Sequence, residues 1–242
     1  MAFCCIIWGT DPETSKNPAR TCTEGIGMAQ RAAPRNLVVR YTMSERVVHW
    51  TVALSFLYVM FTGLALFWPP FFWLADVFGS GPVIRVWHPI VGLAFIAALA
   101  VMFTKWVRDM FLDGEDRKWL AHVREYATGE DRGVPEAGRF NAGQKLLFWL
   151  QLGSAVLLVL SGVVLWFPGS FGRALREASF IVHDLAAIAA IGGIILHIYM
   201  GVFVTRGSVQ AMTRGTVSSR WAEAHHGRWF KMMRSGSPAP HR

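Results

Sequence analysis

The sequence predicts an all-α integral membrane protein built as a bundle of four membrane-spanning helices. Hydrophobic residues make up 53% of the 242 residues and charged residues only 17%, and the mean hydropathy of +0.34 is high for a soluble protein. The apolar residues are gathered into four blocks with almost no charge inside them. The basic residues alternate with these blocks in the manner of a membrane protein.

The four apolar blocks cover about 46–68, 83–106, 145–167 and 180–204. At a rise of about 1.5 Å per residue, each is long enough to cross a hydrocarbon core of about 30 Å. Lipid offers the backbone no hydrogen-bonding partner, so we expect each block to be a helix. Breakers such as Pro69-Pro70 and Pro168-Gly169 separate the blocks. Tryptophans stand near the block ends, as in an interfacial aromatic belt: Trp68, Trp73, Trp87, Trp106, Trp149 and Trp166.

The 24 Lys and Arg residues are distributed unevenly. Six lie in 1–48, eight in 104–146 and seven in 205–242, and only Arg85, Arg173 and Arg176 lie in the two other loops. Basic loops stay on the cytoplasmic side of a membrane, so both termini and the middle loop are expected there. The formal charge of +8 therefore indicates contact with membrane lipid, and we expect no nucleic-acid partner.

One domain is expected over 36–232. Residues 1–35 are expected to be a disordered extension, and 233–242 a disordered tail. Met28 is an alternative start site within the extension. Its thiols are expected to be unpaired, since they have no metal-ligand spacing and lie on the reducing side: Cys4, Cys5 and Cys22. In the middle loop, Asp116–Thr128 has the apolar spacing of a surface helix.

Four of the eight histidines lie in or at the edge of the apolar blocks: His49, His88, His183 and His197. Ionisable side chains at such depth are costly and usually functional. Because successive helices alternate in direction, His49 and His197 are expected at the cytoplasmic level, and His88 and His183 at the outer level. The fourteen residues between His183 and His197 correspond to a rise of about 21 Å and nearly whole turns, so both face the bundle at two depths.

Two imidazoles on opposite sides of an iron make a haem site with no open position, which suits electron transfer. Bundle cores are where such cofactors lie. We therefore expect two b haems, an inner one held by His49 and His197 and an outer one held by His88 and His183. Small residues within the helices fit the close approach of a flat macrocycle, although ordinary helix packing explains them as well: Gly63, Gly92, Gly162, Gly192, Gly193 and Gly201.

Other interpretations of the histidines remain. A single zinc site for all four is excluded by the separation of about 21 Å along one helix. A metal-ion transporter would add carboxylates, and only Asp184 stands near, at a helix edge. A haem-free membrane anchor for a peripheral enzyme is the third alternative. His225 and His226, in the basic tail, are expected to be surface or subunit-contact residues rather than ligands.

A polar segment opens the third apolar block at the cytoplasmic level. Asn141 there is typical of a helix N-cap. A second, compatible interpretation is a quinone site, because a helix N-terminus carries free N–H groups and a positive dipole end. Gly143 and Gln144 would offer their amides to a quinone carbonyl, and His197 would offer a ring nitrogen.

Several motifs together resemble the cytochrome b (gamma) subunit of membrane-bound respiratory formate dehydrogenases, over about residues 37–232. The four-histidine framework alone is shared with the cytochrome b of nickel–iron hydrogenases and with other b561-like subunits. The segment at 140–145 and the tail are more specific. The matching stretches are Arg46–Thr51, His88-Pro89, Phe140–Lys145, His197–Met200 and the tail segment 207–229, with its Trp221-Ala222 and His225-His226.

The resemblance implies a place in an electron path. In that family a molybdenum or tungsten catalytic (alpha) subunit oxidises formate, and an iron–sulfur (beta) subunit passes electrons to the outer haem. The inner haem then reduces menaquinone or ubiquinone near the cytoplasmic face of a bacterial inner membrane. The resemblance assigns the quinone pocket to Asn141, Gly143, Gln144 and His197.

The chain shows no molybdopterin-binding or cysteine-cluster motif, so we expect an electron-transferring and quinone-reducing subunit with no formate-oxidising site of its own. A nickel–iron hydrogenase subunit is the nearest alternative and differs in partner rather than in mechanism. The extension 1–35 and Asp184, beside His183, depart from the family pattern.

Overall fold

The computed structural model describes residues 37–128 and 135–236. The expectations for the extension, including those for Cys4, Cys5, Cys22 and Met28, lie outside these ranges. The last six residues of the expected tail also lie outside them, and the segment before them is helical to Arg234.

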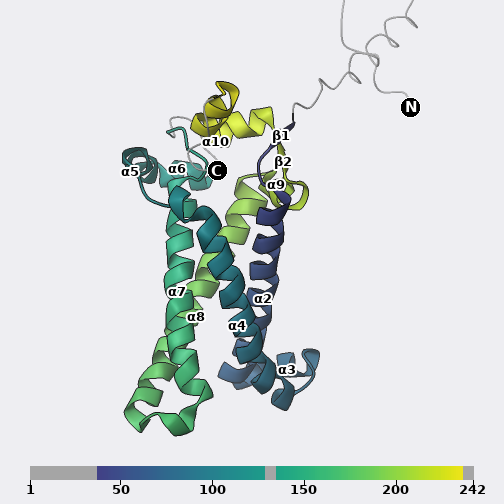
Figure 1. Ribbon diagram of the computed structural model, residues 1–242, viewed down its shortest axis with the longest axis vertical. Helices are drawn as coiled ribbons and strands as arrows, with labels where there is room; N and C mark the ends of the chain where they lie inside the picture. The colour runs from purple at the N-terminus through teal and green to yellow at the C-terminus, as the bar shows by residue number, and fades with distance from the viewer. Residues whose placement is uncertain (1–36, 129–134, 237–242) are drawn as a thin grey trace, which may run out of the picture. The chain divides into compact units, whose positions relative to one another are not determined.

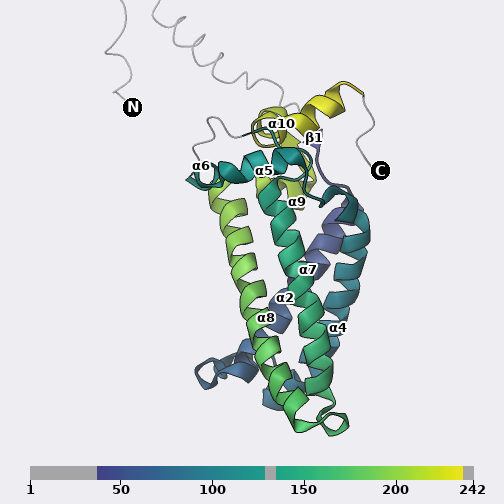
Figure 2. The same ribbon diagram turned by 90° about the vertical axis from the view of Figure 1, so that its left-hand side faces the viewer.

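Four helices are long and apolar enough to cross a membrane. They are α2 (Met43–Phe67), α4 (Gly81–Trp106), α7 (Ala142–Trp166) and α8 (Arg173–Tyr199). Each contains most of one apolar block, so the predicted all-α membrane fold is confirmed. They pack as two antiparallel hairpins, α2 with α4 and α7 with α8, and the hairpins also meet along α4 and α7 (Figures 1 and 2).

Polar caps set where two of these helices begin. Thr42 and Glu45 form a capping box at the start of α2: the Thr42 hydroxyl accepts from the Glu45 amide, and the Glu45 carboxylate accepts from the Thr42 amide. Asn141 and Gln144 form the same motif at the start of α7. Both helices therefore begin three residues before the apolar blocks, since a cap needs polar side chains that the hydrocarbon-crossing segment lacks.

The α3 end of the bundle holds short elements between the membrane helices. They are the 3₁₀ turn Pro69–Phe71, α3 (Trp73–Val77) and the 3₁₀ turn Pro168–Ser170. The four tryptophans at this end are exposed, as an interfacial belt requires: Trp68, Trp73, Trp87 and Trp166. Trp106, near the opposite end, is instead buried, because its indole Nε1 donates to Glu45 Oε1 at 2.8 Å.

The basic end, opposite α3, carries most of the extramembrane structure (Figure 1). Its elements are β1 (Leu37–Val39), the 3₁₀ turn Val107–Asp109, α5 (Gly114–Ala121), α6 (Val123–Thr128), the π-helix Met200–Val204, α9 (Ser208–Arg214), β2 (Thr216–Ser218) and α10 (Ser219–Arg234). The expected surface helix at 116–128 is two helices, because the backbone of His122 leaves the helical region at φ −111° and ψ 19°.

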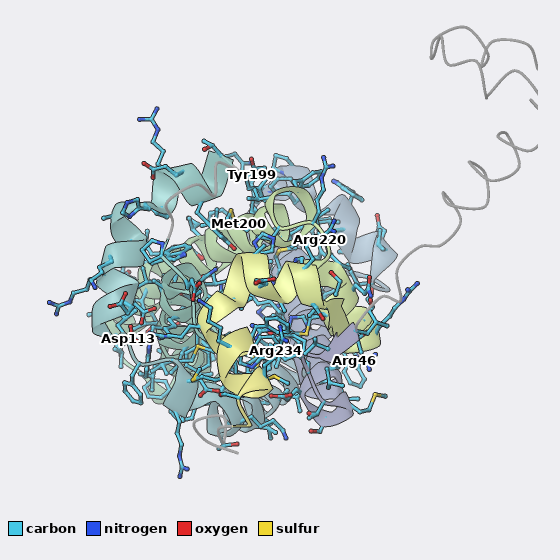
Figure 3. The ribbon with its side chains drawn as sticks, turned by 90° about the horizontal axis from the view of Figure 1, so that it is seen from above. Arg46, Asp113, Tyr199, Met200, Arg220 and Arg234 are labelled. Carbon is cyan, nitrogen blue, oxygen red and sulfur yellow. The ribbon has the colours of Figure 1, made fainter. Side chains whose placement is uncertain are left out.

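The chain segment before α2 and the segment after α9 pair as an antiparallel ribbon, which the sequence analysis did not predict. Leu37 lies opposite Ser218 and Val39 opposite Thr216. The helix that follows, α10, lies across the ends of the membrane helices, with Arg220 and Arg234 toward its two ends (Figure 3). The ribbon thereby ties the entry to α2 to the C-terminal cap of the bundle.

The expectation that His226 lies at the surface is wrong. His226 is only 2% exposed. Its Nδ1 donates to the carbonyl oxygen of Gly138 at 2.8 Å, and its Nε2 lies 3.3 Å from Nη2 of Arg40. Arg40 is itself buried, with its guanidinium 4.4 Å from the ring centre of Trp229. A helix folded across the bundle end buries residues that an extended tail would expose.

Candidate functional site

The membrane helices bring the four histidines together as two pairs. The ring centres of His49 on α2 and His197 on α8 lie 6.2 Å apart, and those of His88 on α4 and His183 on α8 lie 6.4 Å apart. Within 37–128 and 135–236, no three metal-ligating side chains gather at one point. The histidines therefore lie as two separate pairs, His49 with His197 and His88 with His183.

The separations within the pairs fit a shared metal ion. Two metal–imidazole bonds of about 2 Å on opposite sides of an ion, with about 1.1 Å from each nitrogen to its ring centre, separate the centres by about 6.2 Å. A direct hydrogen bond of about 3 Å would bring them to about 5.2 Å or less. The observed 6.2 and 6.4 Å match the first separation, so the two imidazoles of each pair could hold a haem iron between them.

Hydroxyl groups fix the outer pair, His88 and His183. Thr62 Oγ1 lies 2.9 Å from Nδ1 of His88, and Ser161 Oγ lies 3.0 Å from Nδ1 of His183. Each hydroxyl donates its own proton to a backbone carbonyl of its helix, Thr62 to Tyr58 at 2.8 Å and Ser161 to Leu157 at 2.6 Å. The hydroxyl oxygens therefore accept from Nδ1–H, which leaves Nε2 of both histidines deprotonated and able to bind a metal.

A glycine beside each hydroxyl makes room for the histidine ring. A Cβ on Gly63 would lie 3.2 Å from Cε1 of His88, and a Cβ on Gly162 would lie 3.4 Å from Cε1 of His183. Gly193 instead serves helix packing, since a Cβ there would meet Gln151 and Leu147 of α7. The remaining predicted small positions have open space beside them: Gly92, Gly192 and Gly201.

The inner pair has different surroundings. Nδ1 of His49 is buried without a hydrogen-bond partner in the part of the chain that the structure describes. The π-helix Met200–Val204 begins three residues after His197, and Thr205 closes it by donating its amide and hydroxyl to the Met200 carbonyl. Such local widening of a helix is frequent beside functional sites.

Thr62 and Ser161 belong to the candidate site, because they contact His88 and His183, and the sequence analysis missed them. A signal for them exists: the first helix of each hairpin contains a hydroxyl-glycine dipeptide, Thr62-Gly63 on α2 and Ser161-Gly162 on α7. Each hydroxyl residue precedes its histidine by a similar interval, 26 residues for His88 and 22 for His183. The two hairpins therefore present their outer histidines by the same local device.

The expected quinone residues open α7. Asn141 Oδ1 accepts from the Gln144 amide at 2.9 Å, and Gln144 Oε1 accepts from the Asn141 amide at 3.0 Å. The Gln144 amide, which the sequence analysis left free, is thus committed to the cap. Asn141 Nδ2 donates to the Tyr126 hydroxyl at 3.2 Å, and Trp119 covers Gly143, since a Cβ there would lie 3.3 Å from its ring.

An aromatic cluster connects this segment to the inner pair. Trp119 and Tyr126 pack with their ring centres 4.8 Å apart, and with Ala142 they form a buried cluster against which Met200 packs. Met200 stands three residues after His197 on the same helix. Asn141, through its bond to Tyr126, and Met200, just after the helix that carries His197, therefore both contact this cluster.

Comparison with known proteins identifies the fold family. The profile of the prokaryotic cytochrome b561 family matches residues 40–215, which include all four paired histidines. The nitrate-inducible formate dehydrogenase cytochrome b556(Fdn) subunit of Escherichia coli K12 is 35% identical over 198 residues, 81% of this chain and 91% of that protein. The cytochrome b556(fdo) subunit of the same strain is 35% identical over 203 residues, 83% of this chain and 95% of that protein.

A relative from a second organism extends the likeness. The formate dehydrogenase cytochrome b556 subunit of Haemophilus influenzae is 32% identical over 198 residues, 80% of this chain and 82% of that protein. The matches, the four apolar helices and the paired histidines agree. The chain is a multi-pass membrane protein that belongs to the prokaryotic cytochrome b561 family, whose members bind haem b.

Proposed function

We propose that this chain is the di-haem cytochrome b subunit of a membrane-bound formate dehydrogenase, which carries electrons across the bilayer to a quinone. The observation that carries the proposal is the presence of two histidine pairs, at 6.2 and 6.4 Å, in one four-helix bundle. Ionisable residues are energetically costly in lipid. A haem-free anchor would not require four intramembrane histidines in paired positions, so that function does not explain them.

The names of the relatives support a formate dehydrogenase as the complex to which this chain belongs. The similar proteins from Escherichia coli and Haemophilus influenzae are all cytochrome b556 subunits of formate dehydrogenases, and each match covers at least 80% of this chain. This favours a formate dehydrogenase over a nickel–iron hydrogenase. We propose that an iron–sulfur (beta) subunit delivers the electrons and that a molybdenum or tungsten (alpha) subunit oxidises formate.

Each haem, when bound, supplies a one-electron carrier with no open coordination position. His88 and His183 would hold the outer haem toward the α3 end, and His49 and His197 the inner one toward the basic end. Helix α8 carries one ligand of each pair. A single rigid helix therefore sets the distance between the two levels, about 21 Å along its axis.

The charge distribution supports a direction across the membrane. The basic end holds α5, α6, α9 and α10, in the segments with most of the Lys and Arg residues. We place this end, with both termini, at the cytoplasm of a bacterial inner membrane. Electrons would enter at the α3 end from outside the cell and leave at the basic end, where the quinone takes its protons from the cytoplasm.

The quinone pocket is proposed at Asn141, Gly143, Gln144 and His197. Quinone carbonyls need hydrogen-bond donors. The capping box uses the amides of Asn141 and Gln144, and Asn141 Nδ2 donates to Tyr126. The side-chain Nε2 of Gln144 is the donor that none of these bonds uses. The dipole end of α7 adds a positive potential that stabilises charge on a reduced quinone.

The test is formate-driven reduction in membranes that hold the native complex, with menaquinone or ubiquinone as acceptor. Formate should reduce two b haems per chain and then the quinone, and a strain lacking this chain should oxidise formate only with an artificial dye. Reduction of these haems by hydrogen gas and not by formate would show that the chain serves a hydrogenase instead. A purified chain without haem would refute the proposal.

A further inference from the structure

The hydrogen bonds behind the two histidine pairs differ. His88 and His183 each donate Nδ1–H to a hydroxyl, Thr62 at 2.9 Å and Ser161 at 3.0 Å, and His183 also has a hydrogen bond to the backbone of Leu158. Nδ1 of His49 has no such partner among residues 37–128 and 135–236. The two sites therefore present the same two ligand types to iron with different hydrogen bonding behind them.

The acceptors on the outer pair are rigidly placed. Thr62 is fully buried and Ser161 is 4% exposed. Both hydroxyls are anchored to carbonyls one turn earlier in their own helices, and both histidine rings lie against an adjacent glycine. Each hydroxyl is oriented by its own helix, so its lone pair is directed at Nδ1 before any cofactor binds.

From this geometry we infer that Thr62 and Ser161 are positioning residues that lower the reduction potential of the outer haem. An acceptor on Nδ1–H fixes the tautomer and ring orientation and increases electron donation from Nε2 to the metal. Greater donation stabilises the ferric state, and hydrogen bonding beyond the ligand is a recognised control on haem potential. The inference rests on the proposed two-haem function.

The consequence concerns the direction of electron flow. Hydroxyl acceptors lie behind both outer ligands, and Nδ1 of His49 has none among the described residues, so the potential of the outer haem is lowered relative to that of the inner one. This difference favours transfer from the α3 end to the basic end. Thr62 and Ser161 thus favour electron transfer in the direction that quinone reduction requires.

The test is a redox titration of the purified holoprotein, with the outer haem identified as the one lost in His88→Ala. Ser161→Ala removes one oxygen and adds no bulk, and Thr62→Val replaces the hydroxyl by a methyl group of similar size. Both variants should raise the midpoint potential of the outer haem and leave the inner one unchanged. Thr62→Ser, which keeps the hydroxyl, should retain the wild-type potential.

Ser55→Ala is the matched control. Ser55 also lies on α2 and bonds the carbonyl one turn earlier, at Thr51, at 2.6 Å, so the variant removes an equivalent hydroxyl that does not face His88. An unchanged outer potential in Ser161→Ala and Thr62→Val, or an equal shift of both haems, overturns the inference and leaves the proposed function intact. Wild-type protein without two haems would refute the proposed function itself. If Thr62→Val fails to assemble, Thr62→Ala, which also removes the hydroxyl beside His88, takes its place.

Discussion

His49 on α2 and His197 on α8 face each other with their ring centres 6.2 Å apart, too far for a direct hydrogen bond and suited to one shared metal ion. This pairing predicts the result of removing ligands singly. His49→Ala and His197→Ala should each lose the same haem, and His88→Ala and His183→Ala should each lose the other, because both imidazoles of a pair would hold one haem iron.

The measurement for this prediction is a haem assay with reduced-minus-oxidised spectra of the purified variants. His122→Ala is the control, since His122 stands between α5 and α6 outside the membrane helices and should leave both haems in place. A crossed result, in which His49→Ala and His88→Ala remove the same haem, would contradict the pairing seen in the structure.

Glycines beside the outer pair give a second prediction. Gly63→Val should displace His88 and reduce the content of the outer haem, because even a Cβ at this position would lie 3.2 Å from Cε1 of His88. Gly162→Val should act in the same way on His183. Gly153→Val, on α7 with nothing within 4 Å of its added Cβ, should leave the haem content near that of the wild type. Equal losses of the outer haem in all three variants would mean that the substitutions act through helix propensity and not through contact with the histidines.

The histidine pairs could be predicted because they depend on the lengths of the apolar blocks and on the positions of the histidines within them. Block lengths give the number of crossings, crossings give alternating directions, and helix pitch places His183 and His197 on one face. The capping boxes at Thr42 and Asn141 are equally local, and the Thr-x-x-Glu pattern beginning at Thr42 would have placed the start of α2 correctly.

The rest depends on contacts between distant segments. A serine or threonine in a membrane helix ordinarily bonds its own helix, so nothing local shows that Thr62 also reaches His88 in the next helix. The ribbon joins three-residue strands from opposite ends of the chain. His226 is buried only because α10 folds back over Gly138 and Arg40, which a basic, polar tail does not reveal.

A buried ion pair predicts a loss of stability. Lys145 Nζ lies 2.6 Å from Asp116 Oδ2, and both side chains are less than 10% exposed. Lys145→Met would leave the Asp116 carboxylate buried and unpaired, so the free energy of unfolding should fall by about 3–5 kcal/mol. Thermal and denaturant unfolding in detergent would measure it.

Lys118 supplies the contrast for that prediction. It pairs with Glu115 at 2.7 Å, but both side chains are about half or more exposed. Lys118→Met should therefore cost less than about 1 kcal/mol. The double variant Lys145→Met with Asp116→Leu should recover much of the stability lost by Lys145→Met, since no buried charge remains. Equal effects of Lys145→Met and Lys118→Met would contradict the argument from burial.

His226 predicts a dependence of stability on pH. Burial, together with the neighbouring Arg40 guanidinium, holds the pKa of His226 well below its ordinary value of 6.5. Below that value the unfolded chain binds a proton at His226 that the folded chain does not bind. The contribution of neutral, buried His226 to the free energy of unfolding is therefore complete above that value and is lost as the pH falls below it. The slope is about 1.4 kcal/mol per pH unit for one group.

Thermal unfolding of the holoprotein between about pH 7.5 and pH 5.5, one unit either side of the ordinary histidine pKa, would measure this slope. His226→Gln, whose amide can replace both hydrogen bonds without titrating, should flatten it. A wild-type slope that persists in His226→Gln would show that the pH dependence arises elsewhere.

The quinone residues require variants that separate capping from binding. Asn141→Asp and Gln144→Glu keep the oxygens that accept in the capping box and remove the amide donors. Quinone reduction should fall about tenfold or more, the effect of losing a hydrogen bond of about 1.5 kcal/mol. Both haem spectra and the reduction of an artificial dye by formate should remain as in the wild type.

Asn141→Ala gives the comparison, because it removes the cap as well, at a cost of about 1 kcal/mol in helix stability. If Asn141→Asp reduces quinone as fast as the wild type while Asn141→Ala does not, Asn141 acts only as a cap, and the pocket must be sought nearer to Met200 and Tyr126. If both variants lose quinone reduction and keep both haems, the Asn141 amide contributes to the binding of the quinone itself.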